Sequence, residues 1–307
     1  MSGGPVFVTG AGRSGKTLLR WLLSSHPNLV VTRRAELWPR FAGRFGDLAD
    51  DANFTRCLHE MLERRQVAWL GPDRQELRRA FVAGAPTDAR LFDLVHRQHA
   101  ARNQKARWGD QSAAYERCAD ELLGAFPDAT VIHMMRDPRD RHVAVGDQRR
   151  ARPGDVGRTT ADWIRSAVRA RHHADRWAES YVIVRYEDLV LRPDAIVRDL
   201  CRVIGEPYVP ELLRMESTRR YDAYRAESPC PLSSEFVGLH RAQLPAHDLA
   251  FIQTVAGEEM AALGYEVEPV RLDRGARVRL AIHLPANAVR LGVSRSTSSV
   301  SDRETVA

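Results

Sequence analysis

Cysteine is scarce in this sequence of 307 residues, and long apolar runs are missing. The four cysteines, Cys57, Cys118, Cys201 and Cys230, lie far apart and form no C-x-x-C pair. This spacing argues against a zinc site and against a disulfide framework, so we expect reduced thiols and a cytoplasmic location. No stretch approaches the ~18–20 apolar residues of a membrane span. Residues 1–5 carry no basic segment, so no secretory signal is expected.

Lysine is almost absent: only Lys16 and Lys105 occur among the 46 basic residues, and all the others are arginine. A compact ammonium on a flexible stem differs physically from a planar guanidinium, so the position of a lone lysine is informative. The net charge of +6 is concentrated in residues 269–307, where seven arginines face three acidic residues. The remaining chain is therefore close to neutral, and a nucleic-acid partner is not expected.

The pattern of apolar residues predicts strands alternating with helices, and 44% of the residues are hydrophobic, enough for a sizeable core. Strands are expected at 5–9, 29–32, 130–135 and 181–185, and helices at 16–25, 115–126, 159–179, 193–204 and 247–263, with a further helix opening at Asp137-Pro138. Such alternation predicts an α/β fold with a central parallel sheet that is covered by helices on both faces.

The chain divides into a main domain and an extension. The domain is expected to span residues 1–268, with a helical region at 47–107 and a mostly irregular stretch at 206–244. Residues 269–307 form a basic C-terminal extension in which the helical signal weakens. The end of this extension is rich in serine and threonine and is expected to be disordered.

The first motif is the stretch VFVTGAGRSGKTLLRWLLSSHP at residues 6–27. Gly10, Gly15, Lys16 and Thr17 fit the pattern G-x-x-x-x-G-K-S/T, which is the phosphate loop of nucleotide-hydrolysing proteins. The strand before the loop and the helix after it supply the required context. Backbone N–H groups of the loop and the helix N-terminus would then bind an anion. A glycine-rich turn without a ligand is the alternative.

The second motif is VIHMMRDPRDRHVAVGDQRR at residues 131–150, where a strand leads into Arg136. Ligands of parallel sheets bind outside the carboxyl ends of the strands, so Arg136 is expected near the anion of the first loop. A guanidinium can bind a phosphate through two parallel hydrogen bonds. The alternative is a helix start that Asp137 caps, with Arg139 and Asp140 as surface charges.

A third segment, VRYEDLVLRPDAIVRDLCRVIGEPY at residues 184–208, combines a strand, a turn and an amphipathic helix. By itself this segment indicates structural support more than chemistry. Together with the first two motifs it has a more specific meaning, because the order of all these segments along the chain is that of a known family.

The chain resembles the sulfotransferases that use 3′-phosphoadenylyl sulfate (PAPS), in their bacterial and tyrosylprotein-type branch. The matching segments are the loop at 10–18 with Ser-His-Pro at 25–27, the Trp-Gly-Asp segment at 108–113, Phe-Pro-Asp-Ala at 126–129, Arg-Asp-x-Arg-Asp at 136–140, Arg-Tyr-Glu-Asp-Leu at 185–189 and a Ser-Ser segment at 233–244. The resemblance covers about residues 5–268. No single motif is decisive, but the ordered set is specific.

The resemblance implies a site for the 5′-phosphosulfate side of the donor in the first loop. That role falls on Arg13, Ser14, Gly15, Lys16 and Thr17. The donor is PAPS, and no metal is expected, because no phosphates have to be bridged by Mg²⁺ and no metal-ligand cluster is evident.

The resemblance also implies a site for the nucleotide part of the donor. Arg136 would hold the 3′-phosphate, and Tyr186 would lie near the nucleotide. A loop from Gly238 to Arg241 would close over it, with His240 where the family often has tryptophan. The family also places a serine eight residues after this arginine, and often another arginine twelve residues after it. Ala144 and Gln148 stand there, and Gly146 or Arg149 could substitute only if the helix shifts.

Two further departures concern catalysis. Lys16 stands where the family usually has threonine, and Gln111 stands where the family has lysine. Negative charge builds on the bridging oxygen as the sulfuryl group leaves, so Lys16 is a candidate to supply the charge that is missing at Gln111. Neutralising bound phosphate is the alternative role for Lys16. Glu36 is the candidate base, with His133, His142 and Asp110 as further candidates.

The sequence therefore predicts an enzyme that moves a sulfuryl group from PAPS to a hydroxyl or amine of a small-molecule or peptide acceptor. Residues 47–107 are expected to shape the acceptor site. A P-loop kinase or nucleotide triphosphatase is the alternative, favoured by the complete loop motif. A third possibility is a nucleotide-binding homologue that has lost catalysis.

Overall fold

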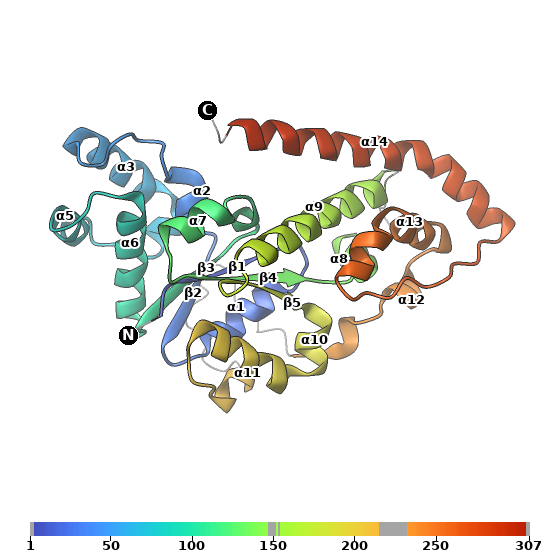
Figure 1. The fold of residues 1–307 in the computed structure, drawn as a ribbon, viewed down its shortest axis with the longest axis horizontal. Coiled ribbons are helices and arrows are strands. Elements are labelled where there is room, and N and C mark those ends of the chain that lie inside the picture. Colours follow the sequence, from blue (N-terminus) through green and yellow to red (C-terminus); the bar gives the residue numbers. More distant parts are fainter. Residues whose placement is uncertain (1–2, 147–151, 153, 215–231, 305–307) are drawn as a thin grey trace.

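Five parallel strands form the central sheet of the computed structural model, in the order β2-β3-β1-β4-β5 (Figure 1). The strands are β1 (Val6–Thr9), β2 (Leu29–Arg33), β3 (Arg107–Gln111), β4 (Thr130–Met135) and β5 (Tyr181–Arg185). β1 is central, and Val8 lies opposite Gln111 of β3 and Ile132 of β4. Loops that follow β2 and β3 therefore lie on one side of the loop after β1, and loops that follow β4 and β5 lie on the other.

The structure describes residues 3–146, 152, 154–214 and 232–304, and the side chains of these residues up to 292. The helices are α1 (Lys16–Ser24), α2 (Leu37–Phe41), α3 (Asp51–Glu63), α4 (Arg65–Ala68), α5 (Arg74–Val82), α6 (Asp88–Arg102), α7 (Ala119–Ala125), α8 (Pro138–Val145), α9 (Asp155–Arg176), α10 (Tyr186–Leu191), α11 (Pro193–Ile204), α12 (His240–Gln243), α13 (Ala246–Ala262) and α14 (Arg274–Glu304). Short 3-10 turns include η1 (Ala113–Arg117), η3 (Pro210–Arg214) and η5 (Ser234–Phe236). None of the helices within these ranges is long and apolar enough to cross a membrane.

Both faces of the sheet are buried, which explains the continuous apolar runs of its strands. Val6 and Val8 pack on one face with α1, α10 and α11. Phe7 points to the other face, where it contacts Trp108 and Tyr115. The predicted α/β fold with helices on both faces is therefore confirmed. The predicted strands at 130–135 and 181–185 and the helix at 193–204 have the predicted limits.

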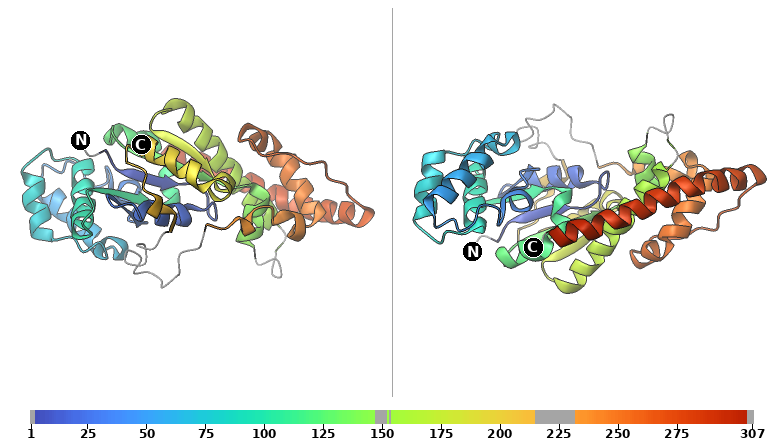
Figure 2. Two further views of the ribbon diagram at one scale, coloured as in Figure 1. Left: turned by 90° about the horizontal axis from the view of Figure 1, so that it is seen from below. Right: turned by 90° about the horizontal axis from the view of Figure 1, so that it is seen from above.

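A separate group of helices, α2 to α6, has its own apolar core around Phe54, Phe81 and Phe92. This region contains the helices that were predicted for residues 47–107. Figure 2 shows it at one end of the molecule, with α12 and α13 at the opposite end.

Strand β3 was not predicted, because its sequence Arg-Trp-Gly-Asp-Gln lacks an apolar run. Hydrogen bonds and close backbone packing, instead of apolar side chains, hold β3 in the sheet. A Cβ on Gly109 would lie 2.3 Å from the carbonyl oxygen of Val6, so glycine lets β3 approach β1. Asp110 is fully buried and accepts a hydrogen bond of 2.7 Å from the hydroxyl of Thr32 on β2.

Helix α14 lies in the C-terminal extension, where the helical signal of the sequence is weak. Its backbone is helical to Glu304. The disorder expected for the serine- and threonine-rich end stays a prediction. The signal was weak because Pro285 lies inside the helix and arginines are spread around it. Figure 1 shows α14 running along α9. Packing against α9 explains the helix, since a Cβ on Gly157 would lie 2.2 Å from the carbonyl oxygen of Asn287.

Candidate functional site

The loop after β1 has the geometry of an anion-binding turn. Gly10 and Gly15 have φ of 125° and 96°, which side chains other than glycine rarely adopt. A Cβ on Gly15 would also lie 2.6 Å from Cδ2 of Tyr186. α1 begins directly after Gly15, and no side chain caps this helix start among the described residues. Its first N–H groups are therefore available to an anion.

Lys16 places its ammonium inside this loop. Nζ donates hydrogen bonds of 2.5 Å to the carbonyl oxygens of Gly10 and Ala11, and the side chain is buried. Burial is the main reason that the pKa of Lys16 is lowered to about 8. The negative charge of Glu116 opposes this shift, and the positive charges of Arg141 and Arg34 add to it. Among the described side chains, no carboxylate forms an ion pair with Lys16. The loop thus contains a buried cation that an anionic ligand would stabilise.

The other predicted loop residues surround the same turn. Ser14 is buried, and its hydroxyl has no hydrogen-bond partner among the described residues. Buried polar groups without a partner are uncommon in proteins, so this hydroxyl suits a ligand oxygen. Thr17 is half-buried, and Arg13 is exposed with φ of 65°. The roles of Arg13, Ser14, Gly15, Lys16 and Thr17 toward a donor stay predictions that this geometry supports.

Arg136 and Tyr186 lie beside the loop, on the side of β4 and β5. The Cζ of Arg136 lies 4.6 Å from the ring centroid of Tyr186. Its Nη2 donates to the carbonyl oxygen of Phe236 at 2.7 Å, and its buried Nε has no partner among the described residues. Since Tyr186 also contacts Gly15, the ends of β4 and β5 meet the phosphate loop. The structure therefore brings Arg136 and Tyr186, two of the residues predicted to hold the nucleotide, next to the phosphate loop.

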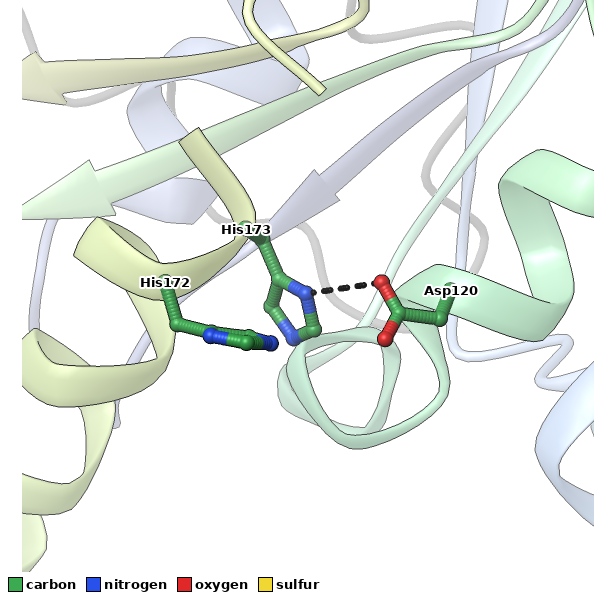
Figure 3. Close-up of side chains that lie close together, drawn as sticks. All are labelled: Asp120, His172 and His173. Carbon is green, nitrogen blue, oxygen red and sulfur yellow. Dashed lines mark hydrogen bonds and ion pairs between the residues drawn. The ribbon is translucent and has the colours of Figure 1, made fainter. Parts of the chain in front are cut away.

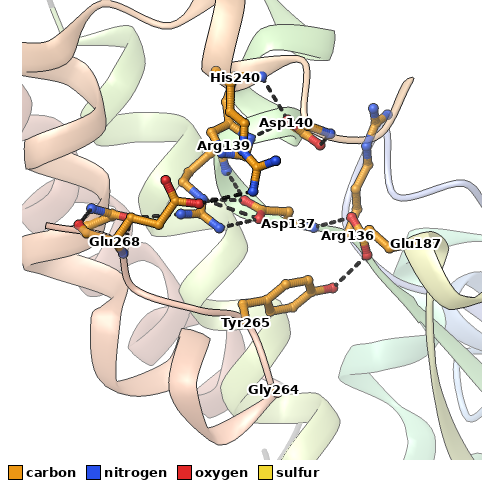
Figure 4. A network of polar contacts seen from close by, with 12 residues as sticks. Arg136, Asp137, Arg139, Asp140, Glu187, His240, Gly264, Tyr265 and Glu268 are labelled. Carbon is orange, nitrogen blue, oxygen red and sulfur yellow. Dashed lines mark hydrogen bonds and ion pairs between the residues drawn. The ribbon is translucent and has the colours of Figure 1, made fainter. Parts of the chain in front are cut away.

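The charged residues that follow Arg136 form a network of hydrogen bonds and ion pairs. Figure 4 shows Arg139 over the carboxylate of Asp137, while Arg136 extends in another direction. Nη2 of Arg139 lies 2.6 Å from Asp137. Asp140 accepts hydrogen bonds from the backbone N–H of Gly238 at 2.6 Å and from that of His240 at 2.9 Å. Asp137 and Asp140 thus position the helix start and the loop around Gly238.

The ring of His240 also binds Asp140, with 2.6 Å between Nδ1 and Oδ1. Burial raises the pKa of Asp140, but hydrogen bonds from His240 and Gly238 outweigh it and hold that pKa below its usual range. Arg241 turns outward and pairs with Glu268 at 3.2 Å, with 70% of its side chain exposed. This arrangement leaves room for the predicted cofactor role of Gly238. Arg241 could contact the cofactor only if its side chain left Glu268. Both roles stay predictions.

Two of the four positions at which this sequence was compared with the family's 3′-phosphate site, Ala144 and Gly146, lie within the described residues. Ala144 is half-buried near the end of α8, and Gly146 follows that helix with extended backbone. Gln148 and Arg149 lie outside the described residues. The alternative that Asp137 caps the helix is also present, since its carboxylate accepts from the N–H of Arg139 at 2.9 Å. Capping and phosphate binding are compatible, because different residues perform them.

A cavity of about 460 Å³ opens beside the phosphate loop, between the segments that follow β2 and β3 and the helices α8 and α9. We call it the β2–β3 cavity. It is lined by Ala11, Gly12, Arg34, Glu36, Pro39, Arg40, Ser112, Ala113, Ala114, Glu116, Arg117, Arg141, Asp162, Arg165 and Arg169. The helical region at 47–107 contributes no residue to this lining. Its predicted role in shaping an acceptor site stays a prediction.

Glu36, the predicted base, lines this cavity, but its oxygens are engaged. It accepts hydrogen bonds of 2.7 Å from Arg40, 3.0 Å from Arg64 and 2.6 Å from Ser112. Burial raises the pKa of Glu36, yet the hydrogen bonds from Ser112 and Arg40 and the nearby arginine charges hold it below its usual range. A carboxylate held this firmly in its ionised form is a weak proton acceptor.

Glu116 is a second carboxylate in the cavity that the sequence analysis missed. Its Oε2 accepts a hydrogen bond of 2.6 Å from Ser166, while Oε1 lies 3.7 Å from Arg169. Glu116 also acts electrostatically on Lys16, so the two charges are close. In the sequence, the position of Glu116 five residues after Gln111 is the one feature that could have indicated its role. That position becomes informative only when the structure shows that η1 directly follows β3.

The three further candidate bases have structural partners. His133 is fully buried between the hydroxyls of Tyr181 and Ser166, at 2.7 and 2.9 Å, and burial lowers its pKa to about 3. Nδ1 of His142 lies 2.7 Å from Oγ1 of Thr159. Asp110 accepts from Thr32, from the N–H of Glu36 and from the hydroxyl of Tyr115. None of these three lines the cavity.

The described residues include two groups of histidine and aspartate with metal-ligand spacing. One consists of Asp120, His172 and His173 (Figure 3), and the other of His247, Asp248 and His283. Both ring nitrogens of His173 already have partners, Asp120 and the carbonyl oxygen of Glu116, each at 3.2 Å. Neither group lies in the phosphate loop or in the lining of the β2–β3 cavity.

A magnesium–nucleotide site needs a free carboxylate near the phosphate loop. Asp110 lies in β3 and Asp137 follows β4, so both are on strands next to β1 where a magnesium ligand could stand. However, Asp137 binds Arg139, and Asp110 accepts hydrogen bonds from several donors. Glu36 and Glu116 remain, but both have cationic neighbours. Each of these four carboxylates, within the described part of the chain, thus already has a hydrogen-bond donor or a cationic neighbour.

Comparison with known proteins agrees with this geometry. The model described as "Sulfotransferase family" matches residues 5–210. The fold is similar to the sulfotransferase domain from the Synechococcus PCC 7002 olefin synthase, at 21% identity and a TM-score of 0.62, covering 86% of this chain and 95% of that one. It is also similar to the sulfotransferase domain from the curacin biosynthetic pathway, at 17% identity and a TM-score of 0.56, covering 87% and 99%.

Among curated proteins, no match to the chain was found. The structural similarities, at this low identity, establish a P-loop-type α/β fold. The family match covers more than half of the residues and includes the phosphate loop, Arg136 and Tyr186. The chain therefore belongs to the sulfotransferase family.

Proposed function

We propose that the protein transfers a sulfuryl group from PAPS to a hydroxyl or amine of an acceptor in the β2–β3 cavity. The observation that carries this proposal is the division of the site by the phosphate loop. Arg136 and Tyr186 directly follow β4 and β5. Glu36 and Glu116 enter the cavity from the segments after β2 and β3, and α8 and α9 complete its wall. A donor in the loop would present its sulfuryl group between the two groups of residues.

The chain supplies positively charged and hydrogen-bonding groups for the donor. Lys16, the N–H groups at the start of α1 and the free hydroxyl of Ser14 suit the phosphosulfate, and Arg136 suits the 3′-phosphate. Two buried polar groups indicate that PAPS fits this site. Nε of Arg136 and the hydroxyl of Ser14 have no hydrogen-bond partner among the described residues, and the bound donor would supply one to each.

The reaction is an in-line displacement at sulfur. A lone pair of the acceptor oxygen or nitrogen forms the new bond to sulfur, and the bond from sulfur to the bridging phosphate oxygen breaks. Adenosine 3′,5′-bisphosphate leaves with that electron pair, and Lys16 stabilises the charge that develops on the oxygen. The acceptor proton passes to a carboxylate. Catalysis thus rests on positioning and electrostatics, without a covalent intermediate.

We assign the proton to Glu116 in preference to Glu36. Glu36 is held by Ser112, Arg40 and Arg64, which keep its pKa low. Glu116 has one oxygen without a hydrogen bond among the described residues, and this oxygen lies 3.7 Å from Arg169. Glu36 would then orient the arginines at the cavity wall, and it remains the alternative base that the experiments below separate from Glu116.

The decisive experiment compares ligands by thermal unfolding. Adenosine 3′,5′-bisphosphate should stabilise the protein, by about 2–3 kcal/mol at a hundredfold excess over its dissociation constant. ATP with Mg²⁺ should stabilise it less, and a chelator should have no effect. Stronger stabilisation by ATP that depends on Mg²⁺ would instead establish the kinase or nucleotide triphosphatase reading.

A further inference from the structure

We propose that the acceptor is a small molecule that carries an anionic group, a carboxylate or a phosphate, besides the hydroxyl or amine that receives the sulfuryl group. This inference rests on the proposed function and names the substrate class of the same site. Its basis is the charge of the β2–β3 cavity, where six guanidinium groups face three carboxylates.

Most of these charges are paired with one another. Glu36 pairs with Arg40 at 2.7 Å and with Arg34 at 3.6 Å. Asp162 pairs with Arg165, and Glu116 lies 3.7 Å from Arg169. These four pairs use all three carboxylates of the lining. They leave two guanidinium groups, those of Arg117 and Arg141, without a carboxylate among the lining residues.

The two remaining arginines differ in their surroundings. Arg141 is buried, and its Nε and Nη1 donate to the carbonyl oxygens of Gly12 and Thr159, at 2.8 and 2.7 Å. Burial lowers its pKa to about 10, although Asp162 and Glu116 partly oppose this. Because Arg141 contacts the phosphate loop through Gly12, the charge of a bound donor would compensate it.

The positive charge of Arg117 is not compensated by a carboxylate or a carbonyl oxygen of the described residues. Arg117 lies at the end of η1, is exposed, and forms no hydrogen bond or ion pair with the described residues. η1 follows β3, so Arg117 belongs to the side of the sheet away from Arg136 and Tyr186. A guanidinium on this wall suits a carboxylate or phosphate of the acceptor, through two parallel hydrogen bonds.

The rest of the lining argues against an apolar acceptor. Ligand pockets are usually lined by hydrophobic and aromatic side chains. The described residues that line the β2–β3 cavity include no aromatic or long aliphatic side chain, and their apolar members are Ala11, Pro39, Ala113 and Ala114. Its volume of about 460 Å³ suits a small molecule. Affinity in such a site must come mainly from charge and hydrogen bonds.

The test measures anion binding while the donor site is filled. The full chain is saturated with adenosine 3′,5′-bisphosphate, and thermal unfolding is followed with malonate, with inorganic phosphate and with uncharged malonamide, at constant ionic strength. We expect malonate or phosphate to stabilise the saturated protein and malonamide to have no effect. Arg117→Gln should abolish most of the stabilisation by the anions. Arg202→Gln is the matched control, because Arg202 is an exposed arginine of α11 paired only with Asp199.

Turnover provides the second measurement. Sulfate transfer from PAPS is compared for glycerol 3-phosphate and glycerol, and for 3-hydroxybutyrate and its amide. We expect kcat/KM to be at least tenfold higher for the anionic member of a pair, and Arg117→Gln to remove most of that preference. The phosphate and carboxylate pairs identify which of the two groups the site prefers.

Several outcomes would overturn the inference. Equal thermal stabilisation by malonate and malonamide would contradict an anionic acceptor. So would an Arg117→Gln variant whose kcat/KM falls equally for charged and neutral acceptors, or a protein whose kcat/KM is higher for the neutral member of each pair. If the bisphosphate still stabilises the protein in these cases, the proposed sulfotransferase function stands and only the acceptor class is wrong. If the bisphosphate itself does not bind, the proposed function fails first.

Discussion

The guanidinium of Arg136 lies over the ring of Tyr186, with 4.6 Å from Cζ to the ring centroid. The same ring would meet a Cβ on Gly15 at 2.6 Å. Tyr186 therefore links the end of β4 to the phosphate loop and fixes the direction in which Arg136 can present its charge. A cation over an aromatic face is attracted to it, so the arrangement holds Arg136 in place before a ligand binds.

The first prediction concerns this arginine. Arg136→Ala should weaken binding of adenosine 3′,5′-bisphosphate by about 2–4 kcal/mol, because a charged hydrogen-bonding partner of the 3′-phosphate is lost. Binding of adenosine 5′-phosphate should hardly change. Titration calorimetry measures both ligands. Equal losses for the two would place Arg136 away from the 3′-phosphate.

Arg241→Ala is the informative companion, since the sequence also predicts a cofactor role for Arg241. Its side chain is exposed and pairs with Glu268. We expect a smaller loss of bisphosphate affinity than in Arg136→Ala. A loss of the same size would show that the loop around Gly238 turns Arg241 inward when the donor binds.

The sequence predicted the positions of the phosphate loop and of Arg136 better than the wall of the β2–β3 cavity, for a physical reason. Strand limits, the phosphate loop and Arg136 depend on local signals: apolar runs, glycines and a charge at a strand end. Glu116 and Arg117 depend on β3 and η1, whose sequence is polar and whose position follows from contacts distant in the chain, such as that of Asp110 with Thr32. α14 was missed because packing against Gly157, rather than its own sequence, accounts for it.

The second prediction tests that packing. Gly157→Ala should destabilise the protein by about 1–3 kcal/mol, because the added Cβ would lie 2.2 Å from the backbone of Asn287 and would separate α9 from α14. Gly124→Ala in α7 is the control. Its Cβ would meet nothing within 4 Å, and alanine there should stabilise the helix by about 0.5–1 kcal/mol. Urea unfolding measures both changes. A neutral Gly157→Ala would argue that α14 does not pack closely on α9.

The third prediction separates the two carboxylates of the cavity. Glu116→Gln should lower kcat by about 10²–10⁴ with little change in bisphosphate binding, as expected for the loss of a general base. Glu36→Gln weakens the contacts with Arg40 and Arg64, so it should mainly raise the acceptor KM. Steady-state kinetics at saturating PAPS measures both. The reverse pattern would make Glu36 the base.

Ser166→Ala supplies the control for Glu116. The hydroxyl of Ser166 donates to Glu116 at 2.6 Å without lining the cavity, so it can act only by positioning. We expect a reduction of kcat smaller than that of Glu116→Gln, with the acceptor KM little changed, because the carboxylate loses the hydrogen bond that orients it. An unchanged kcat would count against Glu116 as the base.

The fourth prediction concerns the pH dependence of stability. The pKa of Lys16 is about 8 in the folded protein and 10.5 in an exposed lysine, so the unfolded chain binds more protons between these values. The unfolding free energy should therefore rise with pH from about 8 to 10.5, by at most about 3 kcal/mol from this residue. Lys16→Met should lack this rise. Denaturant midpoints of both proteins at pH 7.5 and pH 10 measure the difference, and parallel curves would contradict it.

The last prediction returns to the lone lysine of the loop and its chemical role. If Lys16 stabilises charge on the leaving oxygen, its interaction is stronger in the transition state than in the ground state. Lys16→Met should then lower kcat and kcat/KM alike, by about 10²–10³, with the donor KM little changed. Lys16→Arg should also be poor, because a planar guanidinium does not fit where Nζ contacts the carbonyl oxygens of Gly10 and Ala11. A raised donor KM with intact kcat would make Lys16 a ground-state phosphate binder.

A double change tests whether the charge has moved from the end of β3 to the start of α1. Gln111 lies opposite Val8 at the end of β3, and its buried Oε1 has no partner among the described residues. Lys16→Thr with Gln111→Lys restores the arrangement that is usual in the family. If the charge has moved, the double variant should be more active than Lys16→Thr or Gln111→Lys alone, because the two sites are coupled. A double variant no better than the worse single variant would show that Lys16 serves a role that position 111 cannot take over.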